Sequence, residues 1–144
     1  MKASSSAPSP RLTALINLLR FKIIVTVTVW CIPFLVFPAA TVETLGFPAQ
    51  PHLMFVRMLG WAYLALCVGY AFALQEAKRG RQLKGAIWAG VVSNGGACAL
   101  LVLHGASGLW DTWGVMAQLM LWGSAAATAC ITAGLIHFGL REPR

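Results

Sequence analysis

The sequence predicts an all-α integral membrane protein: a four-transmembrane-helix antiparallel bundle with both termini in the cytoplasm. The first observation is composition, because 58% of the 144 residues are apolar and 10% are charged, whereas soluble domains carry roughly 25% charged residues. The second is that four apolar runs each approach the ~20 residues that a helix needs to cross a bilayer. The third is the placement of the basic residues.

Ten of the eleven basic residues fall on one side of this topology. Such an excess marks the cytoplasmic side of a membrane protein. The net charge of +7 is then better explained by anionic lipid head groups at the cytoplasmic face than by nucleic acid, which we do not expect as a partner. The ten residues are Lys2, Arg11, Arg20 and Lys22 before the first run, Lys78, Arg79, Arg81 and Lys84 after the second, and Arg141 and Arg144 after the fourth.

Residues 1–10 are small, polar and punctuated by proline, which predicts a disordered cytoplasmic tail. Residues 11–140 then form a single membrane domain. Leucine and isoleucine recur at helical spacing in "RLTALINLLRFK", which predicts an interfacial helix leading into the first span. A cleaved signal peptide is the alternative interpretation of "FPAA", but Pro38 makes a poor cleavage context.

The predicted spans cover about 19–37, 54–74, 85–103 and 115–138. Pro33 is expected to bend the first span. A basic cytoplasmic loop, 75–84, joins the second and third spans, and external loops cover 38–53 and 104–114. Three prolines and Gly46 predict a fixed, irregular first external loop. The four cysteines fall one in each span with no CxxC motif, which indicates packing residues rather than disulfides or a zinc site: Cys31, Cys67, Cys98 and Cys130.

Arg57 is the only basic residue on the external side, near the start of the second span. Three roles are open for it. Its side chain can extend to water at the edge of the bilayer, it can form an ion pair with Glu43 or Asp111, the two external acids, or it can bind a ligand. Trp61, four residues later, can receive the guanidinium group on its ring.

Asn94 lies near the middle of the third span, where an amide without a partner is costly. Small residues share its helix face, so a hydrogen bond between helices is expected, and ligand binding is the alternative. In the fourth span Gln118 begins a stripe of polar and small residues. Arg57, Trp61, Asn94 and Gln118 are therefore the candidate ligand-binding residues of a polar pocket open to the external side.

A copper site is a further hypothesis, because thioethers and imidazoles suit Cu(I). Methionines at i, i+4 spacing are more often packing residues, so the sequence requires no metal. The residues concerned are Met54, Met58, Met116, Met120, His52 and His104.

The sequence lacks residues and motifs that several classes of transporter and enzyme require. No acid lies in the middle of a span, which removes the carboxylate of small proton-coupled exporters. No pair of external cysteines, P-loop, GxSxG or HExxH motif is present. No catalytic residue can be nominated, and no cofactor is required.

The segment "FVRMLGWAYLALCVGYAFAL", with Arg57 before Gly60, and Asn94 in the third span resemble the small four-helix bacterial membrane proteins of the DoxX-like kind. The resemblance implies a multi-pass protein of the bacterial cytoplasmic (inner) membrane, in some cases associated with a quinol oxidase. It transfers no catalytic residue.

Three functions are compatible with the sequence. The first is a non-enzymatic accessory or assembly subunit of a larger membrane complex, or a binder of a lipid-like ligand. The second is a quinone-linked membrane redox component, with quinone as its cofactor. The third is a small transporter acting as a homo-oligomer, most simply a dimer.

Overall fold

The computed structural model describes residues 9–50 and 52–140. Helix makes up 82% of the structure, and these residues contain no strand. Four helical rods are long and apolar enough to cross a membrane: Pro10–Val36, Met54–Lys78, Lys84–Ala106 and Val115–Leu140. The prediction of an all-α chain with four membrane-length helices is confirmed. The predicted disordered tail, 1–10, lies outside the described residues except for Ser9 and Pro10.

The first rod is longer than the predicted span because the expected interfacial helix continues into it without a break. It consists of α1 (Pro10–Val25), a π-helical turn η1 (Thr26–Cys31) and α2 (Ile32–Val36). Ser9 caps its start, since its Oγ accepts a hydrogen bond from the backbone N–H of Leu12 at 3.3 Å. Pro10 occupies the first helical position, where its missing N–H costs nothing.

Two prolines shape the far end of this rod. Pro33 has no N–H to donate to the preceding turn, and the wider π-helical turn comes immediately before it. Phe37 is extended, at φ −66° and ψ 132°, as expected for a residue that precedes a proline. The chain then leaves the rod at Pro38 and forms a short helix, α3 (Ala39–Thr44).

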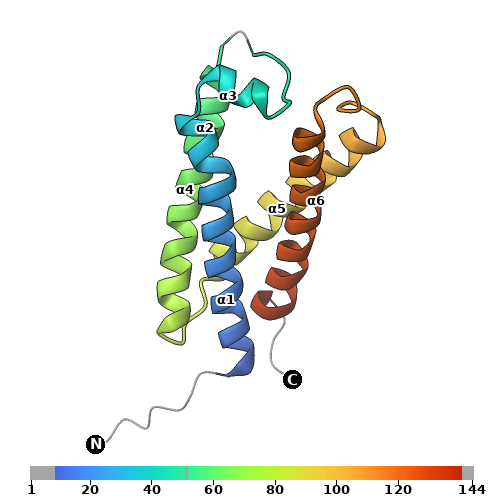
Figure 1. Cartoon of the computed structure of the whole chain (residues 1–144). Coiled ribbons are helices and arrows are strands. Elements are labelled where there is room, and N and C mark those ends of the chain that lie inside the picture. The colour runs from blue at the N-terminus through green and yellow to red at the C-terminus, as the bar shows by residue number, and fades with distance from the viewer. Residues whose placement is uncertain (1–8, 51, 141–144) are drawn as a thin grey trace, which may run out of the picture.

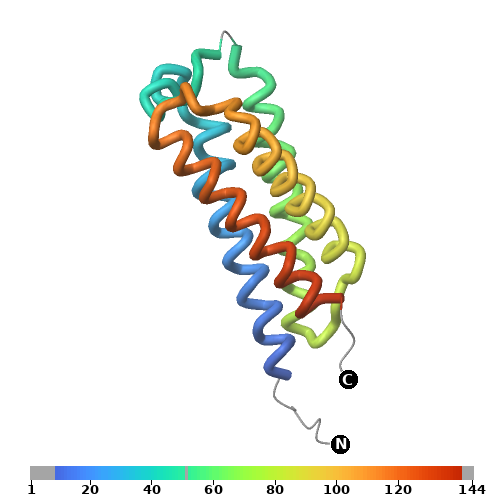
Figure 2. The backbone as a smooth tube through the Cα atoms, turned by 90° about the vertical axis from the view of Figure 1, so that its right-hand side faces the viewer, coloured from blue at the N-terminus to red at the C-terminus, as the bar shows by residue number. Residues whose placement is uncertain are grey.

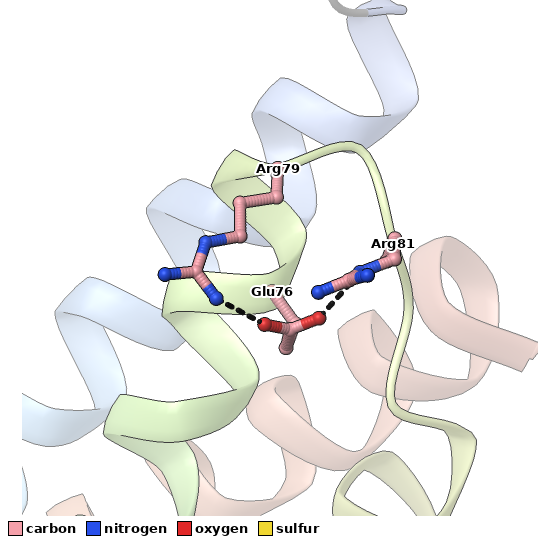
Figure 3. A network of polar contacts seen from close by, with 3 residues as sticks. All are labelled: Glu76, Arg79 and Arg81. Atoms are coloured by element: carbon pink, nitrogen blue, oxygen red, sulfur yellow. Dashed lines mark hydrogen bonds and ion pairs between the residues drawn. The ribbon is translucent and has the colours of Figure 1, made fainter.

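The next rods are α4 (Met54–Lys78) and α5 (Lys84–Ala106). The turn between them begins with a Schellman motif, in which Gly80 N–H donates to Ala77 O at 3.0 Å and Arg81 N–H donates to Glu76 O at 2.9 Å. Gly80 has φ +78°, which explains the glycine. The Glu76 carboxylate also accepts from Arg79 at 2.8 Å and Arg81 at 2.6 Å (Figure 3). These contacts fix a tight turn between the two rods.

The last rod, α6 (Val115–Gly134) followed by η2 (Leu135–Leu140), packs along α5. The four rods therefore form two hairpins: the first rod with α4, and α5 with α6 and η2. Figure 1 shows the hairpins close together at the end that holds both termini and diverging toward the end that holds α3. In the view of Figure 2, α6 overlaps α1 and α5 overlaps α4, and short stretches of these pairs are in contact. We call these ends the termini end and the α3 end.

The hydrophobic core lies between the hairpins toward the termini end. All four rods contribute to it, and close approach is possible because Gly90 on α5 faces Tyr70 and Leu135. A Cβ atom added at Gly90 would lie 2.7 Å from a Leu135 methyl group. The core residues are Leu15, Leu19, Tyr70, Ala73, Ile87, Ile131 and Leu135.

A second contact joins the hairpins at the α3 end. Gly114 N–H, just before α6, donates to Gly46 O at 2.9 Å, and Phe47 packs against Trp113 with ring centroids 5.9 Å apart. Gly46 has φ +89°, and a Cβ atom there would lie 2.6 Å from Gly114 Cα. The loop after α3 thus reaches the start of α6, so the hairpins meet at both ends.

Candidate functional site

A lysine lies in the middle of the bundle. Lys22 is 12 residues after Pro10 and 14 residues before Val36 in the first rod, or about 18 and 21 Å from its two ends at ~1.5 Å per residue. Its exposed fraction is 4%. A charge at this depth is costly in a bilayer unless polar groups surround it.

Lys22 contacts a neutral amide and an aromatic face. Its Nζ donates to Asn94 Oδ1 on α5 at 2.8 Å and lies 4.4 Å from the centre of the Tyr70 ring on α4, within the range of a cation–π interaction. An ammonium group only donates hydrogen bonds, so it turns the Asn94 oxygen toward itself. The contact between Lys22 and Asn94 therefore joins the two hairpins near the middle of the bundle.

The remaining polar atoms of this cluster are satisfied within α4 and α5. Asn94 Nδ2 donates to Gly90 O at 2.5 Å and lies 3.4 Å from Ser93 Oγ. Tyr70 Oη and Ser93 Oγ are hydrogen-bonded at 3.0 Å. Asn94 is 6% exposed, so its amide bridges helices in a buried setting, where networks of this kind are stronger than on a surface.

The position of Lys22 corrects the sequence analysis, which grouped it with the cytoplasmic residues that precede the first span. The spacing of the buried residues of α1 contained the signal. Leu15, Leu19 and Lys22 lie at i, i+4 and i+7 and are all buried, so the lysine shares the core-facing stripe of the helix. Arg20, two residues earlier, is exposed.

Between Lys22 and the α3 end, the diverging hairpins line a partly open cavity of about 520 Å³. All four rods and the segment from α3 to Gln50 line it, and most lining side chains are aliphatic or aromatic. Its polar members are Gln50, Tyr63, His104, Ser124 and Thr128. The volume falls within the ~300–1,000 Å³ typical of ligand pockets.

A smaller cavity of about 260 Å³ extends toward the middle of the bundle. Asn94 and Thr26 line it, together with residues that also line the larger cavity. The shared residues are Val29, Trp30, Met120, Ser124 and Thr128. The two cavities are therefore neighbours, and Asn94 lines the smaller one.

Trp110 supplies a further polar group at the α3 end of the larger cavity. It is 4% exposed, and its indole N–H has no acceptor in the described part of the chain. The ring packs against Trp122 and Trp113, with centroids 5.7 and 6.4 Å away. A buried N–H without an acceptor is uncommon in folded proteins, so Trp110 adds a donor near a potential ligand.

Arg57 ties the first hairpin together at the α3 end. Its guanidinium donates to Phe34 O and to Phe37 O, each at 2.6 Å. Phe34 O needs this donor because Pro38, four residues later, has no N–H. A cation at a helix C-terminus also complements the helix dipole. Arg57 lines neither cavity.

The other residues proposed from the sequence do not gather around Arg57. Over residues 9–50 and 52–140 the ion pairs are those of Glu76, so neither Glu43 nor Asp111 pairs with Arg57. Trp61 is largely exposed. Gln118 Nε2 donates to Asp111 O at 3.2 Å and Trp113 O at 3.0 Å, which fixes the loop before α6. Of the four candidate ligand-binding residues, only Asn94 lines a cavity.

The residues of the copper hypothesis differ in exposure and surroundings. Met54, Met58 and Met116 are exposed on the bundle, whereas Met120 lines both cavities. His104 lines the larger cavity and His52 is exposed. No group of three histidine, cysteine, aspartate or glutamate side chains in the described segments is arranged to hold a metal ion.

No protein-family model, curated protein or solved structure matches this chain. The resemblance to DoxX-like proteins therefore stays a prediction. Any functional argument depends on the cavities and on the cluster around Lys22.

We expect Asn94→Leu to lower the free energy of unfolding by about 2–3 kcal/mol, because the buried ammonium group loses its hydrogen-bond acceptor. Lys22→Met removes donor and charge together and should cost less. The double variant Lys22→Met, Asn94→Leu should be more stable than the sum of the single effects predicts. Titration with sodium dodecyl sulfate, followed by circular dichroism, measures all three.

Asn17→Leu is the matched control, because Asn17 is exposed on α1, and it should change stability by less than about 0.5 kcal/mol. Strict additivity of the two core substitutions would show that Lys22 and Asn94 do not interact.

For Arg57→Leu we expect a loss of about 2 kcal/mol, because two carbonyl groups lose their donor. Arg57→Lys should recover only part of it, since an ammonium group lacks the planar fork that spans both carbonyls. The same titration measures the effect, with Arg20→Leu, an exposed arginine of the first rod, as the control. A fully stable Arg57→Leu protein would contradict the assigned contacts.

Proposed function

We propose that this chain is a non-enzymatic membrane protein that binds an apolar, lipid-like ligand between its two hairpins. The observation that carries the proposal is the cavity of about 520 Å³ with mainly aliphatic and aromatic lining. Pockets that bind small molecules combine such walls with a few polar groups. Here those groups include His104, Ser124 and Thr128.

We also propose that the termini end faces the cytoplasm, in the inner membrane of a bacterium. The charge distribution supports this orientation. The described basic residues at the termini end are Arg11, Lys78, Arg79, Arg81 and Lys84, whereas the α3 end has Arg57 and the acids Glu43 and Asp111. An excess of lysine and arginine favours the cytoplasmic side, and anionic head groups are suitable partners for it.

The orientation predicts how introduced cysteines react with a membrane-impermeant maleimide. Thr112→Cys, in the exposed loop at the α3 end, should react in intact spheroplasts. Gln82→Cys, in the turn between α4 and α5, should react only after the membrane is opened. The parent protein, with its four native cysteines, gives the background. The reverse pattern would contradict the proposed orientation.

The ligand proposal predicts that Ala97→Trp displaces the bound molecule, because Ala97 lines the larger cavity and an indole would fill part of it. Ala99→Trp is the matched control, since Ala99 is exposed on the same helix. Each protein is purified in a mild detergent, and extracted lipids are quantified by mass spectrometry.

We expect the parent protein and Ala99→Trp to retain one lipid-like molecule per chain and Ala97→Trp to lose it. Equal retention by both tryptophan variants, or no retained molecule in any protein, would contradict the proposal. The extract also separates the alternatives predicted from the sequence. A quinone would favour the redox component, and a stoichiometric partner protein would favour the accessory subunit.

A further inference from the structure

Lys22 has no negatively charged partner in the described protein. The described acids are Glu43 and Asp111 at the α3 end and Glu76, which binds Arg79 and Arg81. The groups around Lys22 Nζ are the Asn94 amide, the Tyr70 ring and the Cys67 thiol, none of which is a carboxylate. An ammonium group in apolar surroundings is strongly stabilised by an anion placed nearby.

The smaller cavity lies next to this cluster. Asn94, whose amide oxygen accepts the Lys22 hydrogen bond at 2.8 Å, is one of its lining residues. Thr26, Ser124 and Thr128 add residues with hydroxyl groups to the lining. Lys22 itself lines neither cavity and is linked to the smaller one through Asn94.

The larger cavity matches the apolar part of the same ligand. From Asn94 to His104, α5 runs ten residues, or about 15 Å; Asn94 lines the smaller cavity and His104 the larger one. The larger cavity is lined mainly by aliphatic and aromatic side chains, with Gln50, Tyr63 and His104 among them. Such a lining suits the apolar chain of an extended molecule.

We propose that the ligand is a single-chain amphiphile with one carboxylate, whose chain fills the larger cavity and whose carboxylate lies beside Asn94 and is neutralised by Lys22. The inference rests on the proposed function, and it adds the charge, the head group and the direction of the ligand. The chain points toward the α3 end, and the carboxylate lies near the middle of the membrane.

The test compares two probes that share a chain and differ in charge: dodecanoate and dodecanol. Binding to the full chain in a non-ionic detergent is measured by isothermal titration calorimetry at neutral pH, with empty micelles as the blank. Three proteins are compared: the parent, Lys22→Met, and Arg20→Met. Arg20→Met removes one positive charge from the same helix, but from an exposed side chain.

The parent protein should bind dodecanoate about tenfold to a hundredfold more tightly than dodecanol, the range expected for hydrogen bonds to charged groups. Lys22→Met should abolish this preference, while Arg20→Met should keep it. If Lys22→Met does not fold, the comparison of dodecanoate with dodecanol on the parent protein still tests the inference.

Equal affinity of the parent protein for both probes would overturn the charge inference and leave the apolar ligand of the proposed function in place. A preference that persists in Lys22→Met would also overturn it, because another cation would then hold the carboxylate. If neither probe binds, the charge inference and the proposed function both fail.

Discussion

The buried ammonium group of Lys22 constrains how the two hairpins can pack. It lies on the core-facing stripe of α1, and its nearest acceptor, the Asn94 oxygen, belongs to the opposite hairpin. Separating the hairpins, or sliding one along the other, would leave the Lys22 ammonium group in apolar surroundings without its acceptor. The free-energy cost of such a charge far exceeds the cost of losing van der Waals contacts alone. The cluster therefore fixes the relative position of the first rod and α5, and α4 joins it through Tyr70.

The contrast between the two ends of the bundle follows from this constraint. From Lys22 toward the termini the hairpins pack closely, with Gly90 admitting Tyr70 and Leu135. Toward the α3 end the hairpins diverge, and they meet again at Gly46 and Gly114. The space between these two junctions is the cavity. The Lys22 and Asn94 cluster thus lies near one end of a mainly apolar space, and this arrangement connects the fold to the proposed ligand binding.

Sequence patterns predicted the four membrane-length helices because each depends only on local composition. The sequence indicates that Asn94 needs a hydrogen-bond partner. It does not indicate that the partner is Lys22, because Lys22 is grouped there with the flanking basic residues. Arg57 was considered for ion pairs, whereas it donates to Phe34 O and Phe37 O. Phe34 O is free to accept from Arg57 because Pro38, four residues later, has no N–H to donate to it. The sequence gives this contact only if the carbonyl group four residues before each proline is considered.

The cavity could not be predicted from the sequence, because it depends on the angle between two hairpins rather than on any segment. Its walls come from all four rods, and the same residue types line cavities, cores and lipid-facing surfaces in membrane proteins. The glycines at Gly46 and Gly114 offered a partial signal, since close backbone contact needs such residues. The contact between these two glycines joins two loops that are far apart in the sequence, so it depends on the fold as a whole.

The most direct test of this account is a solid-state NMR distance between Lys22 Nζ and Asn94 Cγ in lipid bilayers. The chain has four lysines and two asparagines, so ¹⁵Nζ-lysine and ¹³Cγ-asparagine labels isolate very few pairs, and Asn17 is exposed on α1. We expect a dipolar coupling of the size given by a direct hydrogen bond between these groups, and we expect it to disappear in Asn94→Leu. A parent protein without that coupling would contradict this account.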